Sequence, residues 1–131
     1  CYVWIRKKKK MSYDDNNIFA KILRGEIPCK KIYENDYILS FYDVNPQKKI
    51  HALVIPKGEY CDFDHFTSKA SDKEMSEMMK GITIVAKKLG ISIGVGDGYR
   101  ALVNIGSNGG QEVPHLHFHL FGGEKIGKMV I

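Results

Sequence analysis

Residues 113–123 read Val-Pro-His-Leu-His-Phe-His-Leu-Phe-Gly-Gly. His115, His117 and His119 alternate there with apolar residues, and a period of two is the side-chain period of a β-strand. The pattern predicts a strand with three imidazoles on one face and leucine and phenylalanine on the other. We expect the apolar face in the core. The imidazole face predicts a functional site, because imidazole can be nucleophile, acid, base or metal ligand near neutral pH.

Two helices are expected before this strand. Asn16 or Asn17 can cap a short helix that Gly25 stops. A longer helix over 71–89 opens with a Ser-x-x-Glu capping-box pattern and carries apolar residues at helical spacing. Residues 59–70 are expected to form a loop.

The remaining apolar segments predict a sheet. Besides the histidine segment, strands are expected at 31–34, 37–42, 51–56 and 99–104. Five strands and two helices without strict alternation indicate the α+β class with a mostly antiparallel sheet.

The charge of the chain is concentrated at its beginning. The formal net charge is +5, from 20 basic and 15 acidic residues, but residues 1–10 contain five basic residues and no acidic one. The other 121 residues are therefore formally neutral, which argues against a nucleic-acid surface. We interpret residues 1–10 as a non-native or disordered extension and residues 11–131 as a single domain.

The sequence favours a cytoplasmic protein without a membrane segment. No run approaches the roughly 18 apolar residues of a membrane span. In residues 1–10 the charges follow the apolar residues, the reverse of the order in a secretory signal. Three cysteines give an odd count, which argues against a disulfide framework.

The histidine row could bind zinc or carry out covalent catalysis. His115 and His119 would lie about 13 Å apart along a strand, so both rings would have to bend toward one ion even with Glu112 as a further ligand. A neutral imidazole instead attacks phosphorus well, provided that one tautomer is fixed. The glycine-rich residues 106–110 can supply backbone N–H groups to a phosphate. Catalysis is therefore favoured, with no metal and no cofactor.

The run 115–121 is similar to the His-φ-His-φ-His-φ-φ motif of the histidine triad (HIT) superfamily, where φ is an apolar residue. The resemblance extends over about residues 17–123. Gly122-Gly123 resembles the Hint branch of nucleoside phosphoramidases more than the Fhit branch of dinucleoside polyphosphate hydrolases. Other matching segments are 18–22, 25–28, 41–47, 51–57 and 104–113. The resemblance implies a HIT-like fold whose sheet continues across a homodimer.

The resemblance also implies catalytic roles. His117 would attack the α-phosphate and form a nucleotidyl-histidine. The main-chain carbonyl of His115 would accept a hydrogen bond from the His117 ring. His119 would contact the phosphate and the leaving group, and His51 would support the cluster.

Substrate-binding roles follow from the same resemblance. Asp43 would bind the ribose hydroxyls, and Val44 would pack near the base. The phosphate pocket would be lined by Asn104, Gly110, Gln111 and Glu112. Glu112 stands where some Hint proteins carry a serine, and the Trp-Pro ending common in the Hint branch is absent.

The expected activity is that of an adenosine 5′-monophosphoramidase-like hydrolase. Its substrates would be purine nucleoside 5′-phosphoramidates or acyl-adenylates. Three alternatives remain open: a dinucleoside polyphosphate (Ap3A or Ap4A) hydrolase, a zinc-binding module, and a regulatory interaction protein with a vestigial pocket.

Overall fold

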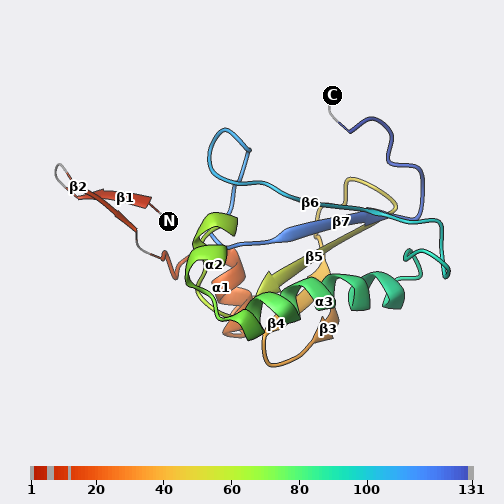
Figure 1. Ribbon diagram of the computed structural model, residues 1–131, viewed down its shortest axis with the longest axis horizontal. Coiled ribbons are helices and arrows are strands. Elements are labelled where there is room, and N and C mark those ends of the chain that lie inside the picture. The colour runs from red at the N-terminus through yellow and green to blue at the C-terminus, as the bar shows by residue number, and fades with distance from the viewer. Residues whose placement is uncertain (1, 6–7, 12, 130–131) are drawn as a thin grey trace.

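The fold is organised around one five-stranded sheet (Figure 1). The computed structural model describes residues 2–5, 8–11 and 13–129. In chain order the elements are β1 (Tyr2–Ile5), β2 (Lys8–Met11), α1 (Ile18–Leu23), β3 (Lys31–Glu34), β4 (Ile38–Tyr42), β5 (Ile50–Pro56), α2 (Phe63–Lys69), α3 (Asp72–Lys88), β6 (Arg100–Val103) and β7 (Phe118–Gly122).

The sheet has the order β3-β4-β5-β7-β6, and every neighbouring pair is antiparallel. The expected five-stranded α+β fold is therefore confirmed. Strand β7 lies between β5 and β6. Its residue His119 pairs with Leu53 of β5 and with Leu102 of β6. The histidine segment thus enters the middle of the sheet, where its apolar side chains can be covered completely.

The two faces of the sheet contact different helices. On one face, Leu116, Phe118 and Leu120 join a core cluster that includes Phe66 of α2 and Met78 of α3. On the other face, a second cluster joins α1 to β4 and β5; its buried members are Phe19, Leu39, Phe41, Leu53 and Ile55. The expected division of the histidine segment is confirmed, since its apolar side chains lie in the first cluster and its imidazoles do not.

The expected strand of histidines is shorter in the structure. Strand β7 begins at Phe118, so His115 and His117 precede it. The physical reason is the neighbouring strand: β6 ends at Val103, opposite Phe118. Beyond that point the Leu116 N–H donates to the carbonyl of Tyr60 instead of to a strand.

The described residues contain a third helix, α2, where a loop was expected. Asp62 caps α2 by accepting a hydrogen bond from the His65 N–H, and Phe66 is buried beneath it. Seven residues are too few for the apolar periodicity that reveals a longer helix. By contrast, the Asn17 cap of α1 and the Ser71–Glu74 capping box of α3 are both present as expected.

The N-terminal strands β1 and β2 pair with each other in a separate two-stranded sheet, which projects from the body in Figure 1. Residues 1, 6 and 7 lie outside the described residues. The interpretation of residues 1–10 as an extension stays a prediction. Among the described cysteines, Cys29 is free.

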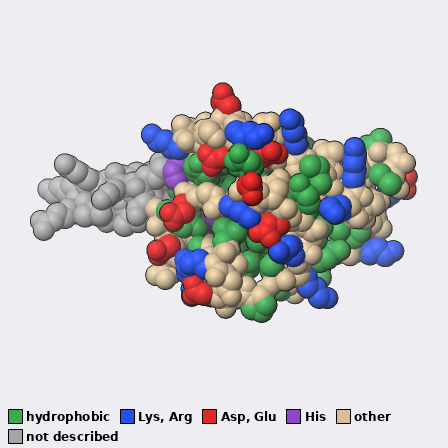
Figure 2. Space-filling model, turned by 90° about the horizontal axis from the view of Figure 1, so that it is seen from below, with side chains coloured by type: hydrophobic (Ala, Val, Ile, Leu, Met, Phe, Trp, Pro, Cys, Tyr) green, Lys and Arg blue, Asp and Glu red, His purple; other side chains and the backbone are tan. Residues whose placement is uncertain are grey.

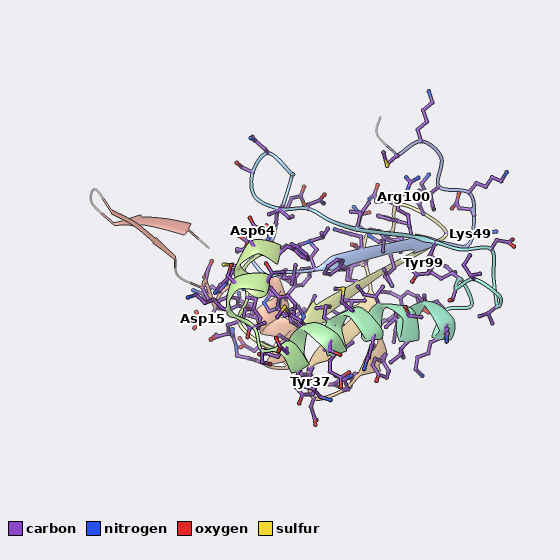
Figure 3. All side chains as sticks on the ribbon, viewed as in Figure 1. Asp15, Tyr37, Lys49, Asp64, Tyr99 and Arg100 are labelled. Atoms are coloured by element: carbon purple, nitrogen blue, oxygen red, sulfur yellow. The ribbon has the colours of Figure 1, made fainter. Side chains whose placement is uncertain are left out.

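The C-terminal tail is fastened at the β6 end of the sheet. The Arg100 guanidinium donates to the carbonyls of Gly127 and Lys128 at 2.8 and 3.0 Å, and the Lys49 N–H donates to the Glu124 carboxylate at 2.6 Å. Figure 3 shows Lys49 and Arg100 at this end, away from Asp15 and Asp64.

Basic and acidic side chains are interspersed over most of the face that Figure 2 shows. This distribution agrees with the neutral charge of residues 11–131. None of the helices in the described part of the chain is both long and apolar enough to cross a membrane.

Candidate active site

His117 is held by the backbone immediately before it. Its Nδ1 lies 2.7 Å from the carbonyl oxygen of His115, and the ring is 7% exposed. A carbonyl only accepts, so Nδ1 carries the proton and Nε2 keeps its lone pair. The Phe19 ring packs edge-on against the His117 ring, with centroids 4.9 Å apart. The arrangement leaves Nε2 with a lone pair that is chemically able to act as a nucleophile.

His115 is buried and does not face the site. Its Nε2 donates to the carbonyl of Pro56 at 2.9 Å, and its Nδ1 accepts from the Tyr13 hydroxyl. The Tyr13 oxygen in turn accepts from the Asn17 amide at 2.9 Å. Both ring nitrogens of His115 are therefore used inside the protein, which leaves its main-chain carbonyl as its contribution to the site.

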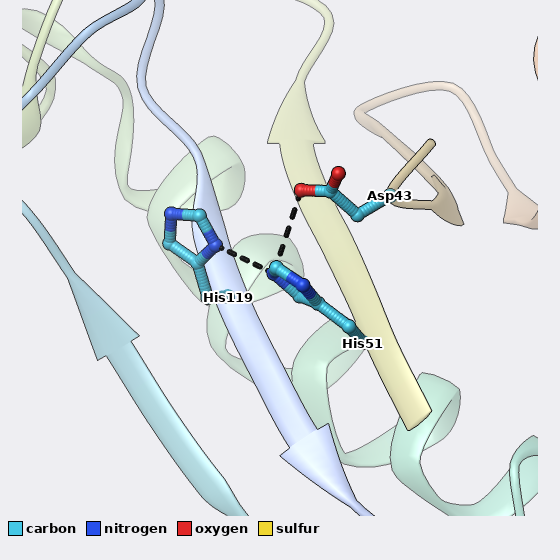
Figure 4. Close-up of side chains that lie close together, drawn as sticks. All are labelled: Asp43, His51 and His119. Atoms are coloured by element: carbon cyan, nitrogen blue, oxygen red, sulfur yellow. Dashed lines mark hydrogen bonds and ion pairs between the residues drawn. The ribbon is translucent and has the colours of Figure 1, made fainter. Parts of the chain in front are cut away.

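His51 and His119 have tautomers fixed by one backbone donor. The Gln47 N–H donates to His51 Nδ1 at 3.1 Å, so the proton of the neutral His51 ring is on Nε2. His51 Nε2 lies 3.0 Å from His119 Nδ1 (Figure 4). That contact makes His119 Nδ1 the acceptor and leaves the His119 proton on Nε2. His119 therefore presents a donor, whereas His117 presents an acceptor.

Asp43 lies beside this pair, at the end of β4. Its Oδ2 is 3.4 Å from His51 Nε2, as Figure 4 shows, and its Oδ1 accepts from the Asn45 N–H at 2.8 Å. The Asp43 N–H donates to the His51 carbonyl, which fixes the loop to β5. The next residue, Val44, is 93% exposed and gives the site an apolar rim.

All four rings are kept neutral at physiological pH. Burial lowers the pKa of His115 and of His119 to about 4, and neighbouring histidines add to the shift of each. Burial also lowers the pKa of His117 and His51. The carboxylates of Asp43 and Glu112 act on His117 in the opposite direction. Neutrality matters because only a neutral ring has a lone pair for attack.

Comparison with known proteins fits this geometry. A family model described as the HIT domain matches residues 24–126. The chain belongs to the HIT family.

Similar HIT proteins cover nearly the whole domain. A HIT-like protein of Azospirillum brasilense is 48% identical over 119 residues, which are 91% of this chain and 95% of that protein. The structure of a histidine triad protein from Clostridium difficile is 42% identical with a TM-score of 0.73, covering 85% of this chain and 93% of its own. A HIT family hydrolase from Clostridium thermocellum is 32% identical with a TM-score of 0.76, covering 89% and 98%.

The glycine-rich loop over residues 106–111 forms hydrogen bonds within itself. The Gly110 and Gln111 N–H groups donate to the carbonyls of Ser107 and Gly106. The Gln111 side chain donates to the carbonyls of Cys61 and Val113 and accepts from the Gly106 N–H. Gln111 therefore braces the loop with its whole amide, and its assignment as a phosphate contact stays a prediction. Asn104 follows β6 at the position that continues the strand register opposite His117.

Three side chains of the site could approach one metal ion. The ligand atoms of Asp43, His51 and His119 lie within 4.8 Å of one another. A metal on His51 Nε2 would, however, require the ring proton to sit on Nδ1, where the Gln47 N–H already points. The Gln47 N–H and the His51 Nδ1–H would then face each other, which disfavours a zinc ion here. The three residues also differ from those of the expected zinc alternative, in which the ligands came from the triad itself.

Two contributors to the site were absent from the sequence predictions. One is the backbone N–H of Gln47, and the other is the Tyr13 hydroxyl, 102 residues from its partner. Neither has a sequence signature. A backbone donor is common to every residue except proline, and the contact of Tyr13 with His115 arises only on folding.

A cavity of about 740 Å³ lies near the C-terminal tail and contains none of the predicted site residues. It is lined by residues 90–91, 96–100 and 123–127.

Proposed function

We propose that this HIT protein is a hydrolase that forms a covalent nucleotidyl intermediate on His117. The substrate class is purine nucleoside 5′-phosphoramidates or acyl-adenylates, in the manner of the Hint branch. The observation that carries the proposal is the bond from His117 Nδ1 to the His115 carbonyl, which leaves Nε2 as a free lone pair. The description of a similar structure as a HIT family hydrolase supports the reaction class.

The reaction follows from the two opposite tautomers. His117 Nε2 attacks the α-phosphorus, and the bond from phosphorus to the leaving atom breaks. A phosphoramidate that is protonated on its nitrogen releases the neutral amine, and an acyl-adenylate releases a carboxylate. His119 Nε2–H donates a hydrogen bond to the phosphate or to the leaving atom. Water then attacks phosphorus, and the bond from phosphorus to His117 Nε2 breaks, which restores the lone pair of this nitrogen. The proton lost by the water passes to the released amine or to solvent, and the nucleoside monophosphate leaves. His51 keeps His119 in its donor form through the 3.0 Å contact.

Asp43 and Val44 form the nucleoside side of the proposed site. A carboxylate can accept from two neighbouring ribose hydroxyls at once, and exposed Val44 offers an apolar surface to the base. Contacts on the phosphate side are assigned to Asn104, Gly110, Gln111 and Glu112. The Gly110 and Gln111 N–H groups would have to leave their present partners to bind phosphate.

The charges around His117 favour a leaving group without negative charge. The carboxylates that act on the His117 ring are those of Asp43 and Glu112. A polyphosphate leaving group would bring several negative charges close to both. An amine leaving group is neutral or cationic and avoids this repulsion. Phosphoramidates are therefore the first choice. Acyl-adenylates, whose leaving carboxylate carries one negative charge, come second, and dinucleoside polyphosphates come last.

Mass spectrometry of quenched enzyme tests the covalent step. After brief mixing with an adenosine 5′-phosphoramidate, we expect an added AMP mass on the peptide that contains residues 115–119. His117→Ala removes the adduct and turnover while AMP still binds. His65→Asn is the matched control, because it replaces a histidine of α2 outside the site and keeps an acceptor for the Cys61 N–H. An unmodified peptide during active turnover would exclude the covalent route.

Side-by-side kinetics decide the substrate class. We expect kcat/KM for an adenosine phosphoramidate to exceed that for Ap3A and Ap4A. The reverse order would assign the protein to polyphosphate hydrolysis. Glu112→Gln should raise activity toward the polyphosphates, because it removes one negative charge near the leaving group.

We also propose a homodimer joined through β6. This strand lies at the edge of the sheet and offers unpaired backbone groups to a second copy. Light scattering coupled to size-exclusion chromatography measures the mass directly, and a monomer at micromolar concentration would rule out a stable dimer.

A further inference from the structure

We propose that Tyr13 is a positioning residue for His117 and that it acts through the ring and the main-chain carbonyl of His115. The inference rests on the proposed role of His117 as nucleophile. Tyr13 and its partner Asn17 both lie outside residues 24–126, the part of the chain that the family model matches.

The cap of α1 sets the direction of the hydrogen bonds. Asn17 Oδ1 accepts from the Ala20 N–H at 2.9 Å, which obliges the Asn17 amide nitrogen to face the other way. That nitrogen donates to the Tyr13 oxygen at 2.9 Å and to the Asp14 carbonyl at 2.6 Å. Since the Tyr13 oxygen already accepts, its own proton is available to donate. Burial raises the pKa of Tyr13, so the hydroxyl keeps this proton.

The Tyr13 proton meets a ring nitrogen that needs a donor. His115 Nε2–H donates to the Pro56 carbonyl, so Nδ1 is the acceptor of this neutral ring. The His115 residue has no solvent exposure, and its rings also contact α1 through Phe19. Tyr13 thus satisfies the one remaining lone pair of His115 and fixes the ring from the second side. Anchoring this ring anchors the backbone that carries it.

Loss of the Tyr13 hydroxyl would affect His117 through two hydrogen bonds, from Tyr13 to the His115 ring and from the His117 ring to the His115 carbonyl. The His115 carbonyl is the acceptor for His117 Nδ1–H at 2.7 Å. If the hydroxyl is missing, His115 retains a buried acceptor without a partner, which favours rotation of the ring or exchange of its tautomer. The carbonyl then moves, and part of the His117 population places its proton on Nε2. That tautomer cannot attack phosphorus.

Tyr13→Phe tests the inference in the full-length protein. It removes the hydroxyl and keeps the ring that packs at 5.5 Å against His115. We expect kcat to fall about tenfold while KM changes by less than about twofold, because the position of the nucleophile changes and the nucleotide contacts do not. Tyr33→Phe is the matched control. Tyr33 lies on the edge strand β3, outside the candidate site, and its hydroxyl also contacts an asparagine, Asn35. This variant should keep wild-type kcat.

Nitrogen NMR of labelled histidines gives a readout that does not depend on turnover. The wild-type spectrum should show His115 as the Nε2–H tautomer and His117 as the Nδ1–H tautomer. In Tyr13→Phe the His115 Nδ1 resonance should shift, and His117 should become a mixture of tautomers. Unchanged resonances of both rings would overturn the inference, whatever the kinetics.

Asn17→Asp provides a second variant that keeps every ring in place. Aspartate still caps α1 but offers Tyr13 an acceptor instead of a donor. The Tyr13 proton should then turn toward residue 17, with the same spectral change at His115. If this variant keeps the wild-type spectrum, the direction of bonding is wrong. If the wild-type protein does not turn over a phosphoramidate, the proposed function fails, and the spectra still decide the positioning role.

Discussion

Acidification should destabilise this protein through its buried histidines, and His115 offers the clearest case. Burial lowers the pKa of His115 from 6.5 to about 4. Between about pH 6.5 and pH 4, His115 is protonated in the unfolded chain but remains neutral in the folded protein. The folded state therefore loses stability as the pH falls from 6.5 to about 4, and the loss is constant below that range.

The size of the effect follows from the shift. One pKa unit corresponds to about 1.4 kcal/mol, so the complete interval is worth about 3 kcal/mol and the part above pH 5 about 2 kcal/mol. His115→Gln removes this titration and keeps an amide that can donate to the Pro56 carbonyl. At neutral pH the variant should be less stable than the wild type, because the Tyr13 hydroxyl loses its acceptor.

Urea unfolding followed by circular dichroism at several pH values between about 7 and 5 measures both proteins. The other histidines titrate in both, so the difference between the two free energies of unfolding isolates residue 115. That difference should shrink by about 2 kcal/mol from pH 7 to pH 5. A constant difference over this range would refute the claim that the folded protein holds a neutral, buried His115.

Further predictions concern binding and the helices. Asp43→Ala should weaken AMP binding by roughly 1.5–3 kcal/mol by calorimetry, because charge-assisted bonds to the ribose are lost; unchanged affinity would remove the ribose assignment. Phe66→Ala should lower the free energy of unfolding by about 3–5 kcal/mol, since this ring is 1% exposed. Ser71→Ala should cost about 1 kcal/mol in the same urea experiment, because the Glu74 N–H loses its cap.

The parts of the fold that the sequence predicted are those with local signals. The alternation at 115–120 is such a signal, because alternate side chains along a strand point to opposite faces. Leu116, Phe118 and Leu120 accordingly lie together in the core. The caps at Asn17 and Ser71 are likewise local. The parts that were missed depend on contacts distant in sequence. Strand β7 starts late because of where β6 ends, and α2 is stabilised by the burial of Phe66 more than by its own pattern.

The candidate site divides in the same way. Residue types and spacing indicated the three histidines at 115, 117 and 119, and the family resemblance added His51 and Asp43. The bond from the His117 ring to the His115 carbonyl has the geometry that this resemblance implied. For the other three rings, the nitrogen that carries the proton could not be predicted. That information comes from Pro56, Gln47 and Tyr13, whose proximity to the rings is a result of folding.

The donor that orients His51 is a peptide group, and this has a consequence for mutational tolerance. Any amino acid with an N–H at position 47 can supply the same proton, so the position is free to vary in side chain without altering the protonation pattern of His51 and His119. Proline alone deletes the donor. A saturation library at Gln47 should therefore show nearly uniform activity with a single inactive member, a profile expected neither of a side chain that binds substrate nor of an unconstrained surface position.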